Sequence, residues 1–260
     1  MNVLVVGAGA MGQWFARTVR THADASVAFT DLDQSAAEAA ADAVGGRAVA
    51  SDAAETFDVV CIAVPMPVAE TAIHEFAPLA TGAIVDVTGS MAGPVAAMQD
   101  AMPDGQRLSL HPLFAPENAP GNVAVVNDAS GPGAAAVVDA LAEAGNNCFE
   151  TTATEHDEAM ETVQASAHAA VLAFAMAAAD VPDRFQTPIS AGLFDLVEQV
   201  TGGDPRVYAD IQNTFDGADA VADAARQIAD ATRTPSNGST SNFHEPGYTP
   251  ADTRKRPVPP

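Results

Sequence analysis

Three glycines near the N-terminus form the pattern in this sequence that most clearly suggests chemistry. Gly7, Gly9 and Gly12 stand in the spacing G-x-G-x-x-G, between the apolar run VLVV and a helical segment. In that spacing the first glycine permits a tight turn, the second lets a pyrophosphate approach the backbone, and the third lets the helix pack on the strand. The free amides of Ala10 and Met11 would then face the phosphates. The pattern predicts a dinucleotide-binding loop.

An acidic residue after the next strand indicates which dinucleotide is bound. Asp31 ends the segment SVAFTD, where a carboxylate accepts hydrogen bonds from both hydroxyls of a ribose. Asp31 and the neighbouring Asp33 would repel a phosphate at that position, so we expect NAD rather than NADP. Val64, which ends the apolar run DVVCIAV, completes the residues that we expect to contact NAD.

Three histidines beyond this loop are candidates for proton transfer. His111 follows the strand-like run RLSL and stands at the carboxyl edge of the expected sheet, where ligands of open α/β sheets bind. A histidine before proline is also common as a capped loop residue. His168 lies in an apolar helical run and is either hydrogen-bonded in the core or lining a site, because an unpartnered ring costs about 1 to 3 kcal/mol there. His156, in TEHDEAM, is interpreted as part of a solvated first helical turn.

The elements that would position these residues alternate in the first part of the chain. Short apolar runs are separated by helical segments, which predicts right-handed crossovers and a parallel sheet covered on both faces. The fold class is therefore α/β, with an N-terminal doubly wound Rossmann sheet. Strands are expected in NVLVVGAG, SVAFTD, RAVA, DVVCIAV, GAIVDV, RLSLHP and NVAVVND and near 147–151, and helices near 11–20, 35–44, 68–76 and 133–144.

The pattern changes after the last of these strands. From Glu155 to Asp180 a run without Gly or Pro predicts one long helix, whose later half is too apolar to be exposed on any side. A small all-helical second domain follows, with further helices expected near 188–200, 205–214 and 219–232. We predict three parts: a Rossmann domain at 1–152, a helical substrate and dimerisation domain at 153–233, and a disordered tail at 234–260.

The charge of the chain excludes several kinds of partner. It has 34 Asp and Glu against 11 Lys and Arg, a formal net charge of -23. No basic stripe is present for nucleic acid or an anionic membrane face, so we expect no nucleic acid and no membrane partner. The single lysine is Lys255. An acidic, lysine-poor sequence favours a protein of a halophilic archaeon, because in molar salt a Debye length of about 3 Å screens self-repulsion. A generally acidic bacterial protein is the alternative.

Cysteine usage and hydropathy indicate the compartment. Cys61 and Cys148 are too few and too far apart for a disulfide framework or a metal site. The chain starts with a strand-like run rather than a basic segment and an apolar stretch, and no apolar run reaches the roughly 18 residues of a membrane span. We expect a cytoplasmic protein that binds no metal.

Two segments together resemble the prephenate dehydrogenase family of tyrosine biosynthesis, which acts on prephenate or arogenate. They are HPLFAPE, after the Rossmann half, and EHDEAMETVQASAHAAVLAFA further along; DVTGSMAGPVAAM and RVYADIQNTF extend the likeness, which runs from Met1 to about Thr214. The resemblance implies NAD-dependent oxidative decarboxylation of prephenate to 4-hydroxyphenylpyruvate. His111 would accept a hydrogen bond from the ring hydroxyl while hydride leaves for NAD and the ring carboxylate departs as CO2. A neutral imidazole with a pKa of about 6.5 is suited to that role.

The resemblance also implies a serine near His111. Many relatives carry Ser-Val-Lys after the strand that ends at Asp86, whereas this chain reads Thr88, Gly89, Ser90 and then methionine. The ungapped serine position is Gly89. Ser90 is our candidate for this catalytic role, and Thr88 is the alternative.

Substrate carboxylates require a cation, which the resemblance places in the helical half. Bacterial relatives have an arginine before YADI, but the ungapped position here holds Gln199. Arg206 is our candidate for binding a carboxylate, and a partner subunit could supply the cation instead. His168 is expected at the same substrate site. A homodimer through the helical domain is expected from its apolar helix and from the resemblance.

Other functions stay open at this stage. Arogenate, which carries an amine in place of one carbonyl, is the alternative substrate. β-Hydroxyacid dehydrogenases share the architecture but depend on a lysine in the helical domain, and this chain has none there. Imine reductases of the pyrroline-carboxylate type would not explain His111 and His168 together. A non-catalytic NAD(H)-sensing module is the alternative from another class.

Overall fold

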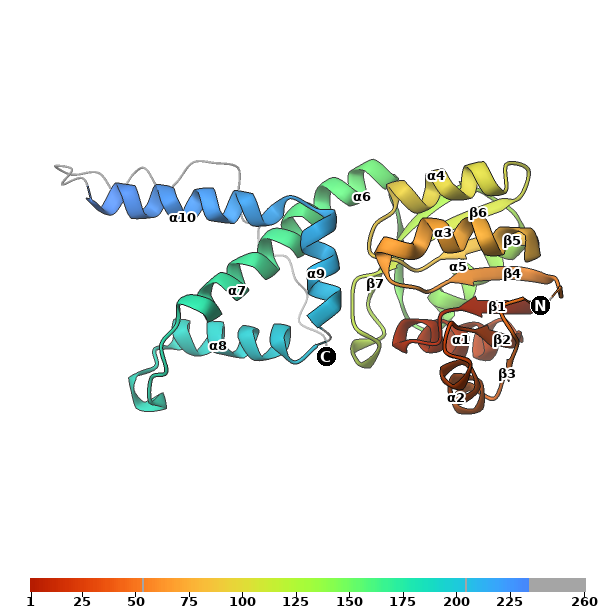
Figure 1. Cartoon of the computed structure of the whole chain (residues 1–260), viewed down its shortest axis with the longest axis horizontal. Coiled ribbons are helices and arrows are strands. Elements are labelled where there is room, and N and C mark those ends of the chain that lie inside the picture. The colour runs from red at the N-terminus through yellow and green to blue at the C-terminus, as the bar shows by residue number, and fades with distance from the viewer. Residues whose placement is uncertain (53, 204, 234–260) are drawn as a thin grey trace. The chain divides into compact units, whose positions relative to one another are not determined.

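The structure is a computed structural model that describes residues 1–52, 54–203 and 205–233 (Figure 1). In this part of the chain the strands form one eight-stranded sheet, in the order β3-β2-β1-β4-β5-β6-β7-β8. The strands are β1 Asn2–Val6, β2 Ser26–Thr30, β3 Arg47–Ala48, β4 Phe57–Ile62, β5 Ala80–Asp86, β6 Gln106–Pro112, β7 Asn122–Ala129 and β8 Asn147–Glu150.

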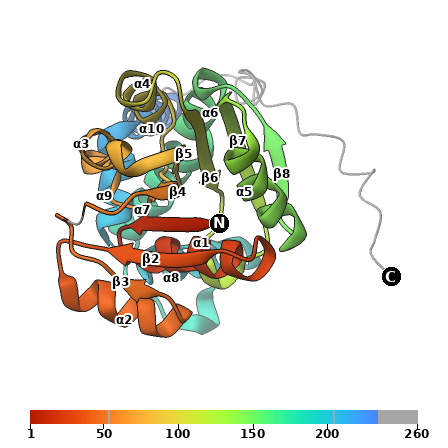
Figure 2. The ribbon, with the colours of Figure 1, turned by 90° about the vertical axis from the view of Figure 1, so that its right-hand side faces the viewer.

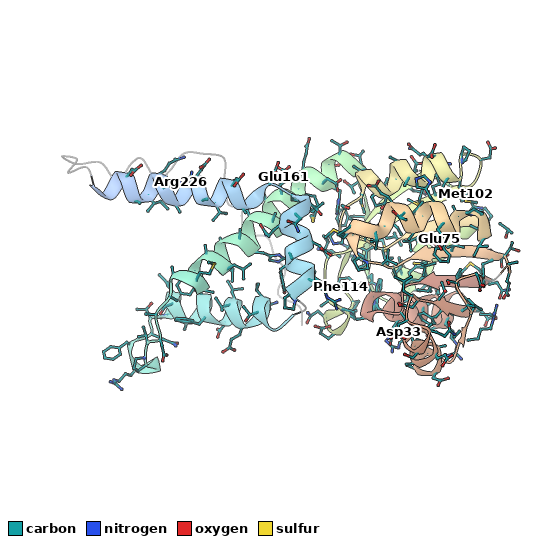
Figure 3. The ribbon with its side chains drawn as sticks, in the orientation of Figure 1. Asp33, Glu75, Met102, Phe114, Glu161 and Arg226 are labelled. Atoms are coloured by element: carbon teal, nitrogen blue, oxygen red, sulfur yellow. The ribbon has the colours of Figure 1, made fainter. Side chains whose placement is uncertain are left out.

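Helices connect most of these strands. They are α1 Ala10–His22, α2 Gln34–Val44, α3 Met66–Phe76, α4 Ala92–Ala101 and α5 Pro132–Glu143, with short 3-10 turns at Ala77–Leu79 and Pro116–Asn118. Asp33, labelled in Figure 3, is the N-cap of α2. Its side chain accepts a hydrogen bond from the backbone N–H of Ser35. The sequence did not predict α4, although Pro94 lies in its first turn, where proline is tolerated.

Two hydrophobic layers cover the two faces of the sheet. Side chains alternate along each strand, so Val3 and Val5 of β1 face one layer while Leu4 and Val6 face the other. Residues of α1, α2 and α5 pack in the first layer, and residues of α3 and α4 pack in the second. Figure 2 shows α3 and α4 on one side of the strands and α5 on the other. The expected doubly wound α/β fold is confirmed.

One strand departs from the parallel arrangement that the sequence predicted. β7 runs antiparallel to β6, whereas the pairs on either side are parallel. Residues 113–121 connect β6 to β7 without a crossover helix, and so short a connection suits only antiparallel neighbours. In this connection Phe114 packs edge to face on Trp14 of α1, with ring centroids 5.4 Å apart. The helix expected at 133–144 is α5, which follows β7.

The second half of the described chain is helical. Its first three segments follow without a break: α6 Ala153–Met160, a π-helical turn at Glu161–Ser166, and α7 Ala167–Ala177. The predicted helix at 155–180 is therefore real but begins and ends two to three residues earlier and contains a π-turn. A 3-10 turn at Asp183–Phe185, α8 Pro188–Thr201, α9 Pro205–Thr214 and α10 Gly217–Arg233 complete it.

A small core holds α6 and α9 to the sheet domain. Met160, Ala165, Ile211 and Phe215 are buried together, and Met66 and Leu113 pack against them. Residues 1–221 form one compact unit, and the part of α10 from Ala222 onward belongs to a second unit. The predicted boundary at residue 152 stays a prediction, and the predicted tail at 234–260 lies outside the described residues. Among those residues, no helix is both long and apolar enough to cross a membrane.

Candidate active site

The glycine loop between β1 and α1 is shaped by close backbone contacts. Gly7 has a φ of +103°, and a Cβ there would lie 2.3 Å from the carbonyl oxygen of Ala63. A Cβ at Gly12 would lie 2.2 Å from the carbonyl oxygen of Gly7. Around Gly9, in contrast, no described atom lies within 4 Å of the added carbon. The fold therefore requires glycine at the first and third positions, while the second leaves an open approach to the backbone.

The residues predicted to contact NAD gather around this loop. Gly9 is the N-cap of α1 and lends no side chain to its amides, so the N–H groups at Ala10 and Met11 are available to a phosphate. Asp31 follows β2, and its Oδ2 accepts a hydrogen bond of 2.8 Å from the N–H of Ala8. Val64 lies beside Gly7, 3.3 Å from where its Cβ would be.

These features suit NAD. The Asp31 carboxylate is held against the loop by one backbone bond on each oxygen and keeps lone pairs for ribose hydroxyls. Leu32, next to it, is fully exposed and offers an apolar surface for a planar base. The open backbone at Gly9 and the helix N-terminus behind it match the needs of a pyrophosphate.

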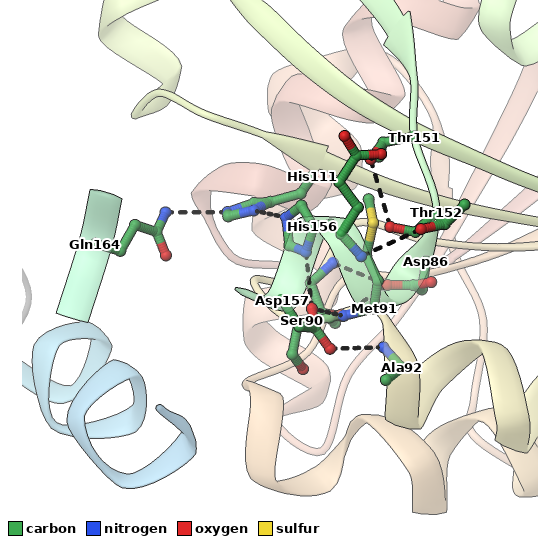
Figure 4. Close-up of polar contacts among 12 residues, drawn as sticks. Asp86, Ser90, Met91, Ala92, His111, Thr151, Thr152, His156, Asp157 and Gln164 are labelled. Atoms are coloured by element: carbon green, nitrogen blue, oxygen red, sulfur yellow. Dashed lines mark hydrogen bonds and ion pairs between the residues drawn. The ribbon is translucent and has the colours of Figure 1, made fainter. Parts of the chain in front are cut away.

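A chain of hydrogen bonds begins at the carboxyl end of β6 (Figure 4). His111 is 7% exposed and His156 of α6 is 3% exposed. Nδ1 of His111 lies 2.8 Å from Nε2 of His156, and Nδ1 of His156 lies 2.7 Å from Oδ1 of Asp157. The solvated first turn predicted for His156 is wrong, because this ring is buried against His111.

Asp157 determines in which direction the hydrogen bonds of this network are donated. Its two oxygens also accept hydrogen bonds from the backbone N–H groups of Met91 and Ala92, at the start of α4. Partial burial raises the pKa of Asp157, but the hydrogen bonds from His156, Ala92 and Met91 outweigh it and hold this pKa below its ordinary value. Asp157 is therefore ionised and acts only as an acceptor.

The tautomers of both histidines follow from this acceptor. Nδ1 of His156 must carry a hydrogen to donate to Asp157, which leaves Nε2 of the neutral ring as an acceptor. Nδ1 of His111 must then donate to that nitrogen, so Nε2 of His111 is unprotonated. Burial is the largest cause that lowers the pKa of His111 to about 3; a protonated His156 would add to this shift, and Asp157 opposes it. His111 is thus a neutral base with a lone pair at Nε2.

The segment after β5 lies beside this lone pair. A Cβ at Gly89 would be 3.8 Å from Nε2 of His111 and 2.9 Å from Sδ of Met66. Thr88 donates its hydroxyl to Oδ1 of Asp86 and to the carbonyl oxygen of Ser90. The Ser90 side chain, a predicted catalytic group, is half-buried and makes no hydrogen bond within the described residues.

Asp86 is a buried carboxyl group beneath this segment. Burial raises the pKa of Asp86 to about 6, and hydrogen bonds from Thr88 oppose that rise. Its Oδ1 accepts from both the hydroxyl and the N–H of Thr88. The carboxyl group therefore stabilises the turn that presents Gly89 to His111.

Two further polar side chains come from the helix that begins with α6. Gln164, in the π-helical turn, places Nε2 3.3 Å from Nε2 of His111. His168 lies one turn further, half-buried, with its ring edge to face on Tyr208 at 5.1 Å. Partial burial lowers the pKa of His168, and its Nδ1 is buried without a partner among the described residues. The structure thus brings His168 into the same helical stretch as Gln164 and His156.

The predicted carboxylate-binding residues lie on other helices. Gln199 in α8 and Arg206 in α9 are exposed, and neither is among the described contacts of His111. Sequence reasoning placed the His156 ring in solvent and did not name Asp157 or Gln164 as site residues. The signal for Gln164 was the spacing of His156, Met160, Gln164 and His168, each four residues apart, which indicates one helical face.

The fold and the glycine loop define an NAD-dependent oxidoreductase. The family model "Prephenate dehydrogenase, nucleotide-binding domain" matches residues 15–128, and the model "Prephenate dehydrogenase, dimerization domain" matches residues 152–246. The chain therefore belongs to the prephenate dehydrogenase family, as its motifs predicted.

Individual relatives agree with that assignment. The 4-amino-4-deoxyprephenate dehydrogenase of Streptomyces pristinaespiralis is 36% identical over 246 residues, which cover 85% of this chain and 80% of that protein. The crystal structure of Aquifex aeolicus prephenate dehydrogenase with hydroxyphenyl propionate and NAD+ has a TM-score of 0.71 at 15% identity, covering 90% of this chain and 89% of that chain. Synechocystis arogenate dehydrogenase has a TM-score of 0.62 at 17% identity, covering 89% and 90%. The two structures show a shared fold.

Proposed function

We propose that this protein catalyses the NAD-dependent oxidative decarboxylation of a prephenate-type substrate. Such a substrate is a cyclohexadiene with a carboxylate at C1 and a hydroxyl or amine at C4. The observation that carries the proposal is the contact of Nδ1 of His111 with Nε2 of His156 and of Nδ1 of His156 with Asp157, from which we infer a lone pair at Nε2 of His111. With prephenate the product would be 4-hydroxyphenylpyruvate.

The reaction balances without a net proton. The glycine loop and Asp31 would hold NAD+, which would supply the acceptor for the hydride that leaves C4. The bond between C1 and the ring carboxylate breaks to release CO2, and its electron pair enters the ring, which becomes aromatic. Prephenate and NAD+ thus give 4-hydroxyphenylpyruvate, CO2 and NADH, and the hydroxyl hydrogen is retained.

His111 has a defined part in this reaction. As C4 loses electron density, the hydrogen on its substituent becomes more acidic, and Nε2 of His111 accepts the stronger hydrogen bond. The Asp157 carboxylate, which is linked to His111 through the His156 ring, stabilises the positive charge that develops on His111. General-base assistance of this kind contributes about 10² to 10⁴ in rate. His111 returns the shared proton when the ring becomes aromatic.

A second candidate substrate is favoured by a specific comparison. The relative that is 36% identical is a 4-amino-4-deoxyprephenate dehydrogenase, whose substrate name places an amine at C4. Arogenate, in contrast, differs from prephenate in its side chain and keeps the C4 hydroxyl. Prephenate, arogenate and 4-amino-4-deoxyprephenate are therefore the three compounds to compare.

A homodimer through the helical half belongs to the same proposal. No residue of α7 is buried, although its sequence is almost wholly apolar, and Met176 is 89% exposed. An apolar helix left in this state favours association with a second copy. The family model that matches this half describes a dimerization domain. Light scattering in molar KCl should give a dimer, and a monomer would remove this part of the proposal.

The experiment is product analysis with the full chain, NAD+ and each of the three compounds. We expect NADH and CO2 in equal amounts with at least one compound. Molar KCl should raise the activity, because it screens a net charge of -23 that would repel an anionic substrate. His111→Asn should lose turnover and retain NAD+ binding. NADH without CO2, or no NADH with any compound, would exclude the proposed reaction and favour an NAD(H)-sensing role.

A further inference from the structure

Gln164 has an acceptor atom that the described protein leaves unused. Its Nε2 lies 3.3 Å from Nε2 of His111, on the side where that ring presents its lone pair (Figure 4). Its Oε1 is buried and has no hydrogen-bond partner within the described residues. Buried polar atoms without a partner are rare in folded proteins and call for an explanation. A donor that arrives with a ligand would provide one.

The backbone at Gln164 also suggests a functional position. The residue lies in the π-helical turn Glu161–Ser166, between α6 and α7. Single π-turns within α-helices occur frequently at functional sites. Here the turn lies between His156 and His168, the two histidines of this helical face. The local conformation therefore places the Gln164 amide beside the base instead of in solvent.

We propose that Gln164 selects an amine over a hydroxyl at C4 of the substrate. This inference rests on the proposed function, in which Nε2 of His111 accepts a hydrogen bond from the C4 substituent. When the C4 substituent displaces the Gln164 Nε2 contact at Nε2 of His111, an amine has at least two N–H donors, one for that nitrogen and one for Oε1 of Gln164. A hydroxyl has a single donor, so it would satisfy His111 and leave Oε1 without a partner.

Gly89 provides the room for this arrangement. A Cβ at residue 89 would lie 3.8 Å from Nε2 of His111 and only 2.9 Å from Sδ of Met66, so any larger residue there would crowd this part of the site. In this segment the Thr88 hydroxyl is bonded to Asp86, whereas the Ser90 hydroxyl is not among the described hydrogen-bond partners of His111 or Gln164.

The test compares kcat/KM for 4-amino-4-deoxyprephenate and prephenate in full-length variants. Gln164→Leu removes the acceptor and should lower the ratio of amine to hydroxyl by at least about fivefold. Gln164→Glu keeps an acceptor but cannot donate to a hydroxyl oxygen, so the ratio should stay equal or rise. The matched control is Gln99→Leu, since Gln99 is an exposed glutamine of α4 bonded to Asp128. It should leave the ratio unchanged.

A binding measurement separates this inference from the proposed function. The ligands are 3-(4-aminophenyl)propionate and 3-(4-hydroxyphenyl)propionate, titrated into the complex with NAD+ by calorimetry. The wild-type protein should bind the amine more tightly, and Gln164→Leu should abolish that preference. If the wild type shows no preference, or Gln164→Leu weakens both ligands equally, Gln164 does not select the substituent, even in an active enzyme. If the preference depends on Gln164 but no substrate is turned over, the selection stands and the proposed reaction fails.

Discussion

Nδ1 of His111 lies 2.8 Å from Nε2 of His156, across 45 residues of sequence. This bond joins the end of β6 to the first turns of α6, and Asp157 extends it to the start of α4. The three elements are therefore tied together at the base that the proposed reaction uses. Because the Asp157 carboxylate is always an acceptor, the bond also determines which nitrogen of His111 is unprotonated.

Replacing His156 should separate its effect on chemistry from its effect on cofactor binding. In His156→Phe, Nδ1 of His111 loses its acceptor, and we expect kcat to fall by about 10² while the Kd for NAD+ stays the same. His156→Gln, whose amide can accept from His111 and donate to Asp157, should recover part of the loss. His74→Phe, an exposed histidine of α3, is the control. Equal losses in His156→Phe and His156→Gln would argue against the relay.

Asp157 should contribute to stability as well as to activity. It accepts two backbone hydrogen bonds at the start of α4, a helix whose N-cap residue, Met91, provides no side-chain cap. Asp157→Asn turns one acceptor into a donor facing these amides, so we expect a loss of about 1 to 2 kcal/mol in the free energy of unfolding. Chemical denaturation measures it, with the exposed Asp195→Asn as control. An unchanged midpoint would show that the capping bonds contribute nothing.

Alanine substitutions at Gly9 and Gly12, at the start of α1, should affect different properties: the first NAD+ binding and the second stability. A methyl group at Gly9 meets no described atom, so Gly9→Ala should fold normally and lose about 1 to 3 kcal/mol of NAD+ binding free energy through crowding. Gly12→Ala places its methyl against the carbonyl of Gly7 and should lower the free energy of unfolding by about the same amount. Calorimetric titration and thermal unfolding distinguish the two effects. Normal NAD+ affinity in Gly9→Ala would place the pyrophosphate elsewhere.

Asp86 predicts a specific dependence of stability on pH. Burial raises its pKa from 3.8 to about 6 in the folded state. As pH rises from 4 to 6, Asp86 ionises in the unfolded chain but stays largely neutral in the folded protein. Ionisation stabilises the unfolded chain, so the free energy of unfolding falls over this pH range. Asp86→Asn stays neutral and accepts the same bonds from Thr88. Its advantage over the wild type should grow to as much as about 3 kcal/mol between pH 4 and 6, then stay constant. A difference independent of pH would contradict the shifted pKa.

Much of the sheet domain could be predicted because its signals are local. Apolar runs bounded by glycine gave the strands, and the glycine spacing with Asp31 gave the cofactor loop. The direction of β7 could not be predicted from its own residues, because they suit a parallel or an antiparallel strand. Only the short connection after Pro112 requires β7 to run antiparallel to β6. Helix α4 was missed because Gly93 and Pro94 stand at its start, where such residues usually indicate a turn.

The site was harder to predict because its main contacts are distant in sequence. His111 was found from its place at the end of β6. His156 was judged exposed from the acidic residues around it, yet Asp157 turns toward α4 and draws the ring inward, through bonds that span 66 and 65 residues. No local pattern reports such contacts. The family resemblance supplied His111 and His168 but not the partner that sets the tautomer of His111.

The central claim is that Nε2 of His111 is unprotonated and Nδ1 is protonated at neutral pH. Long-range proton–nitrogen NMR spectra of the ¹⁵N-labelled protein measure this directly, with the His111 signals assigned by their loss in His111→Asn. We predict a protonated Nδ1 and an unprotonated Nε2 for His111 throughout pH 6 to 8, since burial lowers the pKa of His111 to about 3. A protonated Nε2, or a doubly protonated ring in that range, would contradict the proposed role of His111 as the base.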